Sequence, residues 1–486
     1  RNIQNNSPYY LINYDTSEHT DTVTSGRVNK QVELLKSLKE SDIPLKWRSL
    51  VIAIKEIEFL LHNLALDIEF AIKKDGKIVI FQVRPLCTAQ RFNKNIDNNL
   101  YTEIKRFKDT YKSKSKSFFF KKSFTLSDMC FWNPAEIIGD RSENLSFSMY
   151  KYLLLDEEWN KGLELLGYKK VKKTILLRFG NKAYTEVETA FLALIPKEIN
   201  KKTCNKLISF YIQKLRLKPE LHDKIEFDIL NTCYSPQTEH KLLELTNILN
   251  HKELKTYKNS LINLTKNILD NFDKIKTEDQ NSFLSLKRNR QALKNKIKNS
   301  PTGKKIKIIK ELLKDAKRYA TPQFSRMARL AFIGNQYLRD FLEMKIINEN
   351  DYQNFLINID TIASDVGKNL DMVRFGHLDI STFLAKYGHL RPGTYDITKL
   401  PYEKDSKYFR FAIPKKVNKI NVSKKKVSQK ILINKIDQYL RNFKISIRSD
   451  TLLDFIRDTT ILREQYKFEF TKNLSLSLEA LSDIGE

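Results

Sequence analysis

Apolar and polar positions follow two different patterns along the chain. Up to about residue 92, short runs of alternating residues predict β-strands, and the stretch 47–63 predicts a helix. From about residue 96, apolar residues recur three and four positions apart, for example at 207–217, 240–250 and 259–272, which is typical of amphipathic helices. We therefore predict an α+β protein with a mixed first part and a larger, mostly α-helical second part.

The stretch 67–85 predicts a β-hairpin. Asp75-Gly76 favours a two-residue turn, because glycine adopts positive φ without steric strain. That turn sets Asp67 opposite Arg84 and Glu69 opposite Gln82, and the alternation of side chains places these four on one face. The other face is predicted to be apolar, with Ile68, Phe70 and Ile72 opposite Val83, Phe81 and Val79.

Three further patterns predict local structure. Gly180-Asn181 predicts a turn between two strands within 173–188. The segment 448–484 predicts one long helix or two stacked helices that begin at a Ser449 or Asp450 cap. Prolines are expected at helix starts or in the loops before them, at Pro134, Pro196, Pro236, Pro301 and Pro322.

The polar face of the predicted hairpin carries candidate ligands for metal and phosphate. Mg²⁺ prefers oxygen donors and is usually held by one or two carboxylates plus substrate phosphate, so Asp67, Glu69 and Gln82 are suitable. Arg84 can pair with a phosphate. A surface hairpin with an Asp–Arg pair beside a Glu–Gln hydrogen bond explains the same residues. The pattern alone leaves both interpretations open.

The hairpin sequence resembles a known nucleotide-binding domain. D-I-E-F-A-I, D-G-K-I and I-F-Q-V-R-P-L are similar to the C-terminal end of the ATP-grasp domain in the pyruvate phosphate dikinase and phosphoenolpyruvate synthase superfamily. The D-x-E and Q-x-R-P elements of that family fall on Asp67, Glu69, Gln82, Arg84 and Pro85. The resemblance implies that the acids and the amide handle metal and phosphates and that the arginine contacts phosphate. ATP and Mg²⁺ are then the expected ligands.

Other segments resemble one branch of that superfamily. NPAEIIGDR (133–141), TPQFSRMARLAFI (321–333) and YGHLRPGTYDI (387–397) are similar to the region that follows the ATP-grasp domain in rifampin phosphotransferase-like proteins. YYLINYD (9–15) and TDTVTSG (20–26) resemble the preceding part of the domain, without a role for any single residue.

The resemblance implies a domain order and a reaction. A partial ATP-grasp domain at 1–92 precedes a mostly helical acceptor domain at 93–486, and a swivelling domain with a phosphorylated histidine follows. ATP gives its β-phosphoryl group to that histidine, which phosphorylates a small-molecule acceptor, leaving AMP and phosphate. The glycine-rich T-S-H context of the histidine is absent from this sequence. We therefore expect an internal fragment of a phosphotransferase that is inactive alone. A phosphoenolpyruvate synthase acting on pyruvate is an alternative.

The loop YGHLRPGTYDI provides candidate acceptor-site residues. The family has a G-H-R-G-P-G-E-like loop there, whereas this chain has Leu390-Arg391 in place of Arg-Gly and Thr394 in place of Glu. A Pro-Gly turn with a structural histidine would also explain the loop. The candidate acceptor-site residues are His389, Arg391, Tyr395, Asp396 and Arg141. Further polar residues that a salt-bridged helix surface explains equally well are Glu136, Asp140, Arg326 and Arg329.

Charge and cysteine content limit the remaining classes of function. The 486 residues include 86 basic and 58 acidic ones, a formal charge of +28, which would suit a basic helical module that contacts nucleic acid or an acidic surface. The basic residues are spread along the chain beside abundant Asn and Ile, as an AT-rich genome would produce, so we do not expect a nucleic-acid partner. Scattered cysteines without C-x-x-C pairs, and no run of eighteen apolar residues, predict a cytoplasmic protein without a membrane partner.

Overall fold

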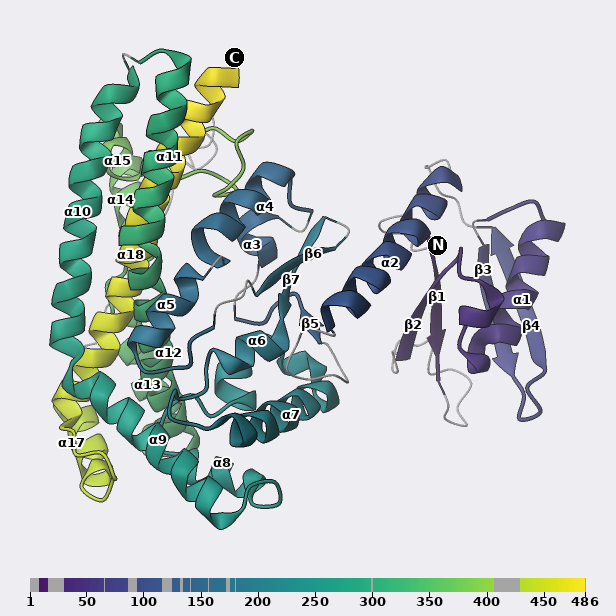
Figure 1. Ribbon diagram of the computed structural model, residues 1–486, viewed down its shortest axis with the longest axis horizontal. Helices are drawn as coiled ribbons and strands as arrows, with labels where there is room; N and C mark the ends of the chain where they lie inside the picture. The colour runs from purple at the N-terminus through teal and green to yellow at the C-terminus, as the bar shows by residue number, and fades with distance from the viewer. Residues whose placement is uncertain are drawn as a thin grey trace. The chain divides into compact units, whose positions relative to one another are not determined.

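The chain folds into two compact units, Arg1–Phe118 and Phe119–Glu486, and each is described separately (Figure 1). The predicted domain boundary lies after residue 92, whereas the first unit also includes a helix at 94–115. The computed structural model describes residues 8–15, 30–64, 66–85, 94–115, 125–131, 134–139, 141–155, 157–171, 175–179, 181–298, 300–405 and 429–485.

In its described residues, the first unit has two separate antiparallel strand pairs and two α-helices. Strand β1 pairs with β2, and β3 pairs with β4. The elements are β1 (Tyr9–Tyr14), β2 (Lys30–Leu35), α1 (Leu45–Leu60), β3 (Leu66–Ile72), β4 (Ile78–Pro85) and α2 (Lys94–Ser115). The segment 9–15 is thus mostly strand β1, whereas 20–26 lies outside the described residues.

Helix α1 packs against side chains from both strand pairs. It begins after Pro44 and ends at Leu60, slightly earlier at both ends than the predicted 47–63. On its buried side, Glu58 accepts a hydrogen bond from the Tyr10 hydroxyl (2.9 Å) and pairs with Lys36. The core joined to α1 comprises Tyr10, Ile12, Leu34, Ile43, Trp47, Leu50, Val51 and Ile54, with Ile68, Phe70 and Ile78 packed against it. This core fixes the apolar face of the β3–β4 hairpin.

The β3–β4 hairpin differs from its prediction at the turn. The Lys73 amide donates to the Lys77 carbonyl (2.9 Å), so the loop has three residues, 74–76, and not two. Gly76 has a φ of +83°, as the last residue of such a loop requires, while Asp75 does not share this positive φ. The predicted two-residue turn is therefore wrong.

A β-bulge in β4 offsets the longer turn. Glu69 pairs with Gln82, but the next residue, Phe70, pairs with Ile80, which leaves Phe81 as the extra residue. Phe81 is 67% exposed, so its predicted place in the apolar layer opposite Phe70 is wrong. Ile72 likewise pairs with Ile78 and not with Val79.

The part of the second unit that the structure describes is mostly helical, with a small sheet of strand order β5-β7-β6. Its strands are β5 (Leu126–Ser127), β6 (Leu176–Phe179) and β7 (Lys182–Glu186). Its helices are α3 (Pro134–Ile138), α4 (Asn144–Tyr150), α5 (Glu158–Leu165), α6 (Val187–Leu192), α7 (Lys201–Leu217), α8 (Thr238–Leu242), α9 (His251–Asp270), α10 (Phe272–Lys298), α11 (Thr302–Tyr319), α12 (Thr321–Glu343), α13 (Glu349–Ile357), α14 (Ile362–Arg374), α15 (Ile380–Tyr387), α17 (Gln429–Leu440) and α18 (Ser449–Gly485).

Helix α12 lies at the centre of this unit, buried along most of its length. It packs against α5 on one side and against the long helix α18 on the other (Figure 1). The contact with α5 is very close, because a Cβ atom placed on Gly162 would lie 2.4 Å from the Pro322 carbonyl oxygen. Helices α10, α11, α14 and α17 also pack against α18.

Most of the local predictions in the second unit are confirmed. The 448–484 segment is a single helix that begins at Ser449. Phe179 pairs with Lys182 across the predicted turn, of which Gly180 lies outside the described residues. The helix predicted at 240–250 is wrong: α8 ends at Leu242, and a 3₁₀ turn and a loop follow. Apolar residues three apart fit a 3₁₀ turn as well as an α-helix, so their spacing did not distinguish the two.

The whole is a mostly helical α+β structure with small antiparallel sheets, in agreement with the predicted class. The ATP-grasp architecture of the first unit stays a prediction. None of the helices in the described part of the chain has the length and apolar content needed to cross a membrane.

Candidate functional site

The β3–β4 hairpin brings the four sequence-predicted nucleotide ligands to one end of the strand pair. Asp67 lies opposite Arg84 and Glu69 lies opposite Gln82, as predicted. The bulge at Phe81 makes this pairing possible, because the three-residue loop alone would shift the register by one residue.

Arg84 connects the polar side chains of the hairpin. Its Nη2 atom donates to Glu69 Oε1 (2.6 Å) and to Gln82 Oε1 (2.7 Å). The Arg84 and Glu69 side chains remain 53% and 42% exposed, and Asp67 is exposed as well. The four residues therefore form an open polar surface whose own cation contacts two of the candidate donor oxygens.

Solvent exposure makes the Arg84–Glu69 pair easy to open. An exposed ion pair contributes only about 0–1 kcal/mol, since water competes for both charges. Glu69 and Gln82 can therefore exchange Arg84 for another cation with little loss of stability. Two carboxylates and an amide oxygen suit Mg²⁺, which usually keeps several waters as ligands. No group of three or more His, Cys, Asp or Glu residues suited to a metal occurs within the described ranges.

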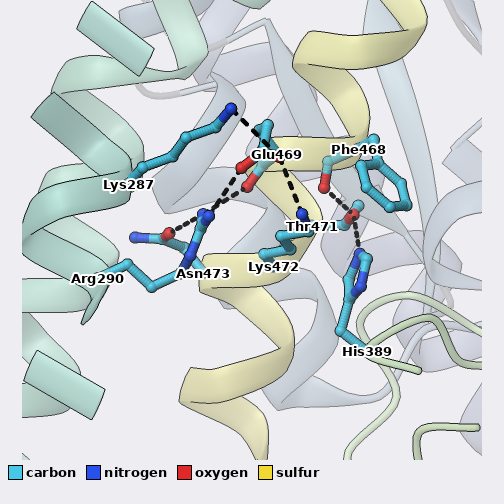
Figure 2. Close-up of polar contacts among 8 residues, drawn as sticks. All are labelled: Lys287, Arg290, His389, Phe468, Glu469, Thr471, Lys472 and Asn473. Atoms are coloured by element: carbon cyan, nitrogen blue, oxygen red, sulfur yellow. Dashed lines mark hydrogen bonds and ion pairs between the residues drawn. The ribbon is translucent and has the colours of Figure 1, made fainter. Parts of the chain in front are cut away.

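The acceptor-loop candidate His389 lies against helix α18. Its Nε2 atom is 3.4 Å from Thr471 Oγ1, and its ring meets the Phe468 ring edge-on with centroids 4.7 Å apart (Figure 2). The Thr471 hydroxyl already donates to the Phe468 carbonyl (2.8 Å), so we assign the proton of the imidazole to Nε2. Burial, together with the charge of Lys472, lowers the pKa of His389 to about 3. The imidazole is neutral at physiological pH.

Arg391 holds the loop to α18. Its side chain is 3% exposed and donates to the backbone and hydroxyl oxygens of Ser475 (3.2 and 2.9 Å) and to the Lys399 carbonyl (3.2 Å). Glu479 lies 3.8 Å away. Burial lowers the pKa of Arg391. These contacts give the guanidinium a structural role in docking the loop.

The other predicted acceptor residues do not gather around His389 in one site. Tyr395 is a core residue, 1% exposed, whose backbone carbonyl accepts from Ser146. Asp396 closes a turn by accepting from the amide and hydroxyl of Thr398 (2.9 and 2.7 Å). Arg141 is exposed on the surface.

The arginines of the QFSRMAR segment are buried inside the second unit. Arg326 is paired with Asp279, and Arg329 donates to the Thr232 hydroxyl (3.0 Å). The sequence was also compatible with a salt-bridged helix surface at these arginines. The structure shows instead that both arginines make buried contacts in the core. The side chains of Glu136 and Asp140 lie outside the described residues.

A charged cluster beside His389 was not predicted from the sequence. Three cations surround Glu469 of α18: Arg290 at 2.7 Å and Lys287 at 3.7 Å, both from α10, and Lys472 at 2.9 Å from the next turn of α18. Figure 2 shows the α10 side chains and Lys472 directed at Glu469, with His389 nearby. We call these four residues the Glu469 cluster. The sequence contains a signal for only one of these ion pairs, because Glu469 and Lys472 are three residues apart on a predicted helix.

The pKa shifts in the Glu469 cluster reflect burial and crowded positive charge. Burial alone would raise the pKa of Glu469, but Lys472 and Arg290 hold it below its ordinary value. Burial lowers the pKa of Lys472; Glu469 opposes this effect, and Arg290 and Lys287 add to it. The three cations thus repel one another across a single carboxylate.

Comparison with known proteins adds no assignment to this geometry. Neither a protein-family model nor a curated protein matches the sequence. The functional conclusions therefore depend on the residues themselves.

Proposed function

We propose that this chain belongs to an ATP-dependent phosphotransferase of the dikinase type. In this proposal the β3–β4 hairpin binds Mg-ATP, and the second unit presents a small-molecule acceptor to a phosphohistidine. The overall reaction converts ATP to AMP and phosphate and phosphorylates the acceptor. Rifampin phosphotransferase-like proteins are the branch that the sequence motifs resemble.

One observation carries the proposal. The side chains of Glu69, Gln82 and Arg84 meet at one end of the hairpin, through a register that needs a bulge to bring them together. Oxygen donors beside an arginine are what a magnesium-bound phosphate chain requires, because phosphoryl transfer depends mainly on positioning and charge neutralisation. Arg84 would leave Glu69 for a phosphate oxygen as the metal takes its place.

The acceptor loop supports the proposal more weakly. His389 is neutral and is held by Thr471, so its second ring nitrogen can accept a hydrogen bond from an acceptor hydroxyl. Its pKa of about 3 makes it a weak base near neutral pH, which limits it to orienting that hydroxyl. Arg391 fixes the loop on α18 and keeps His389 in position.

The proposal is tested by substitution at the hairpin of the intact protein. Glu69→Gln removes a metal-binding carboxylate and is expected to abolish ATP-dependent AMP formation and the binding of Mg-ATP, measured by AMP release and by calorimetry. Asp75→Asn is the matched control, because it removes a carboxylate from the turn of the same hairpin. Normal AMP formation by Glu69→Gln would refute the assignment.

The net charge of +28 supports a second candidate, a basic helical module that binds nucleic acid or another polyanion. That function predicts tight binding to a polyanion with a steep dependence on salt, and no change in melting temperature with Mg-ATP. A salt titration and a thermal-shift measurement on the same protein distinguish the two candidates.

A further inference from the structure

The Glu469 cluster has more positive than negative charge. Lys287, Arg290 and Lys472 contribute three positive charges and Glu469 contributes one negative charge, which leaves a formal excess of two. No other carboxylate is paired with these cations among the residues that the structure describes. Repulsion between the cations is therefore only partly compensated within the protein.

The arginine of the cluster is fixed before any ligand arrives. Arg290 Nη1 donates to Asn473 Oδ1 (3.0 Å) and to the Glu469 carbonyl (3.2 Å), while Nη2 contacts the Glu469 carboxylate. Asn473 is fully buried and donates to the Leu312 carbonyl (3.2 Å). A guanidinium held in this way loses little conformational entropy when it binds an anion.

The cluster is also accessible from one side. Exposure of the side chains rises from 13% for Glu469 and 15% for Arg290 to 27% for Lys472 and 49% for Lys287. The Glu469 carboxylate and the Arg290 guanidinium are thus mostly buried, and the side chains of the two lysines are more accessible to solvent. An anion can approach the lysines without displacing the buried contacts of Arg290.

We propose that Lys287, Arg290 and Lys472 form a binding site for a phosphate group, with Glu469 holding the three cations in place. All three cations lie within 3.7 Å of the same carboxylate, so their donors are close enough together for one tetrahedral anion to contact more than one of them. A phosphomonoester near pH 7 carries a charge of about −1.5 to −2, which balances the excess of the cluster. A monocarboxylate would balance only half of it.

The site lies in the second unit and does not require the nucleotide site to exist. If the proposed function holds, a phosphate here belongs either to a phosphorylated small molecule or to the free phosphate that the reaction releases. Both sources offer the same chemistry to the cluster.

The test is calorimetric titration of the full chain with inorganic phosphate, and separately with glycerol phosphate, in a low-salt buffer without phosphate. We expect one saturable site. Lys287→Gln and Lys472→Gln are each expected to weaken binding roughly tenfold or more, because each removes a charge-assisted hydrogen bond. Lys287 is largely exposed, so its substitution leaves the fold intact.

Lys258→Gln is the matched control. Lys258 and Lys444 share the carboxylate of Glu239 at 2.6 and 3.1 Å, an arrangement similar to the Glu469 cluster but with one cation fewer. The control should bind phosphate as the unchanged protein does. Equal weakening in Lys258→Gln and Lys287→Gln, or no saturable binding at all, would overturn the proposal, as would equally tight binding of acetate.

Two comparisons separate the outcomes further. Competition between glycerol phosphate and inorganic phosphate supports a site for a phosphorylated small molecule, and binding of inorganic phosphate alone supports a site for the free ion. Glu69→Gln should bind phosphate normally. Loss of Mg-ATP binding in that variant, with phosphate binding absent throughout, would therefore reject this site and leave the proposed function standing.

Discussion

Two arginine–glutamate pairs in this molecule have nearly the same length and very different surroundings. Arg84 and Glu69 on the hairpin are 2.6 Å apart, and Arg290 and Glu469 on α10 and α18 are 2.7 Å apart. The first pair is 53% and 42% exposed, and the second is 15% and 13% exposed. Water screens the charges of the exposed pair, whereas it is mostly excluded from the buried pair. Ion pairs of similar length therefore contribute differently to stability.

This difference suits the two sites to different tasks. The hairpin pair opens at little energetic cost, which a metal–nucleotide site needs if its own arginine is to move from carboxylate to phosphate. The Glu469 cluster keeps its arginine in place and would bind an anion without rearrangement. Exposure, more than contact distance, should therefore order the effects of substitution.

The largest loss of stability is expected on substitution of a third arginine, Arg326, whose ion pair is the most buried of the three. Arg326 and Asp279 are 8% and 0% exposed, so Arg326→Ala leaves a buried carboxylate without its partner and should lower the free energy of unfolding by about 3–5 kcal/mol. Arg290→Ala should fall between that and Arg84→Ala, for which about 0–1 kcal/mol is expected. Urea unfolding followed by circular dichroism measures all three. An equal loss in Arg84→Ala and Arg326→Ala would contradict the ranking by exposure.

The next largest effect is expected from alanine substitutions at two glycines, one in each unit. Gly162→Ala places a methyl group 2.4 Å from the Pro322 carbonyl, where α5 meets α12, and should destabilise the second unit by about 1–3 kcal/mol or more. Gly76→Ala in the hairpin turn meets no atom within 4 Å, and its φ of +83° alone should lower stability by about 1 kcal/mol. Thermal unfolding of both variants should show the larger shift for Gly162→Ala; a reversed order would contradict the close packing of α5 on α12.

A pH-dependent effect is expected to be the smallest. Glu188 is 3% exposed, and burial together with nearby Glu186 raises its pKa to about 8. The folded state therefore retains a proton that the unfolded state releases above its ordinary pKa, so this group lowers stability as the pH rises from about 4.5 to about 8.

Glu188→Gln removes that proton equilibrium. The variant should match the unchanged protein at pH 4.5 and exceed its stability by on the order of 1–2 kcal/mol at pH 8, after allowance for screening by solvent. Urea unfolding across this pH range measures the difference, with Asp75→Asn as the exposed control. A gap that is constant with pH would show that Glu188 is ionised in the folded protein.

The sequence predicted the parts of the structure that depend on neighbouring residues. The pairing of Phe179 with Lys182 and a helix that begins at Ser449 follow from local turn and cap chemistry. The pairing of Asp67 with Arg84 was predicted from a two-residue turn that is wrong, and it holds because the bulge at Phe81 compensates for the longer loop. The position of the bulge could not be predicted, because alternation around Phe81 is compatible with either register.

The Glu469 cluster could not be predicted from local sequence patterns. Arg290 and Glu469 are 179 residues apart, and only the packing of α10 on α18 brings them together. Nothing in the local pattern of α10 distinguishes Lys287 and Arg290 from its many solvent-facing lysines. The same applies to Arg326, whose partner Asp279 comes from another helix.

The bulge at Phe81 makes the hairpin tolerant of one change in chain length and intolerant of its neighbours. Deleting Phe81 would straighten β4 and still leave Glu69 opposite Gln82 and Asp67 opposite Arg84, because only the unpaired residue is lost. Deleting the paired residue Val83 would instead make Arg84 follow Gln82 directly, so that these two side chains project from opposite faces. A single-codon deletion should therefore separate the polar residues at one of these positions and leave them together at the other.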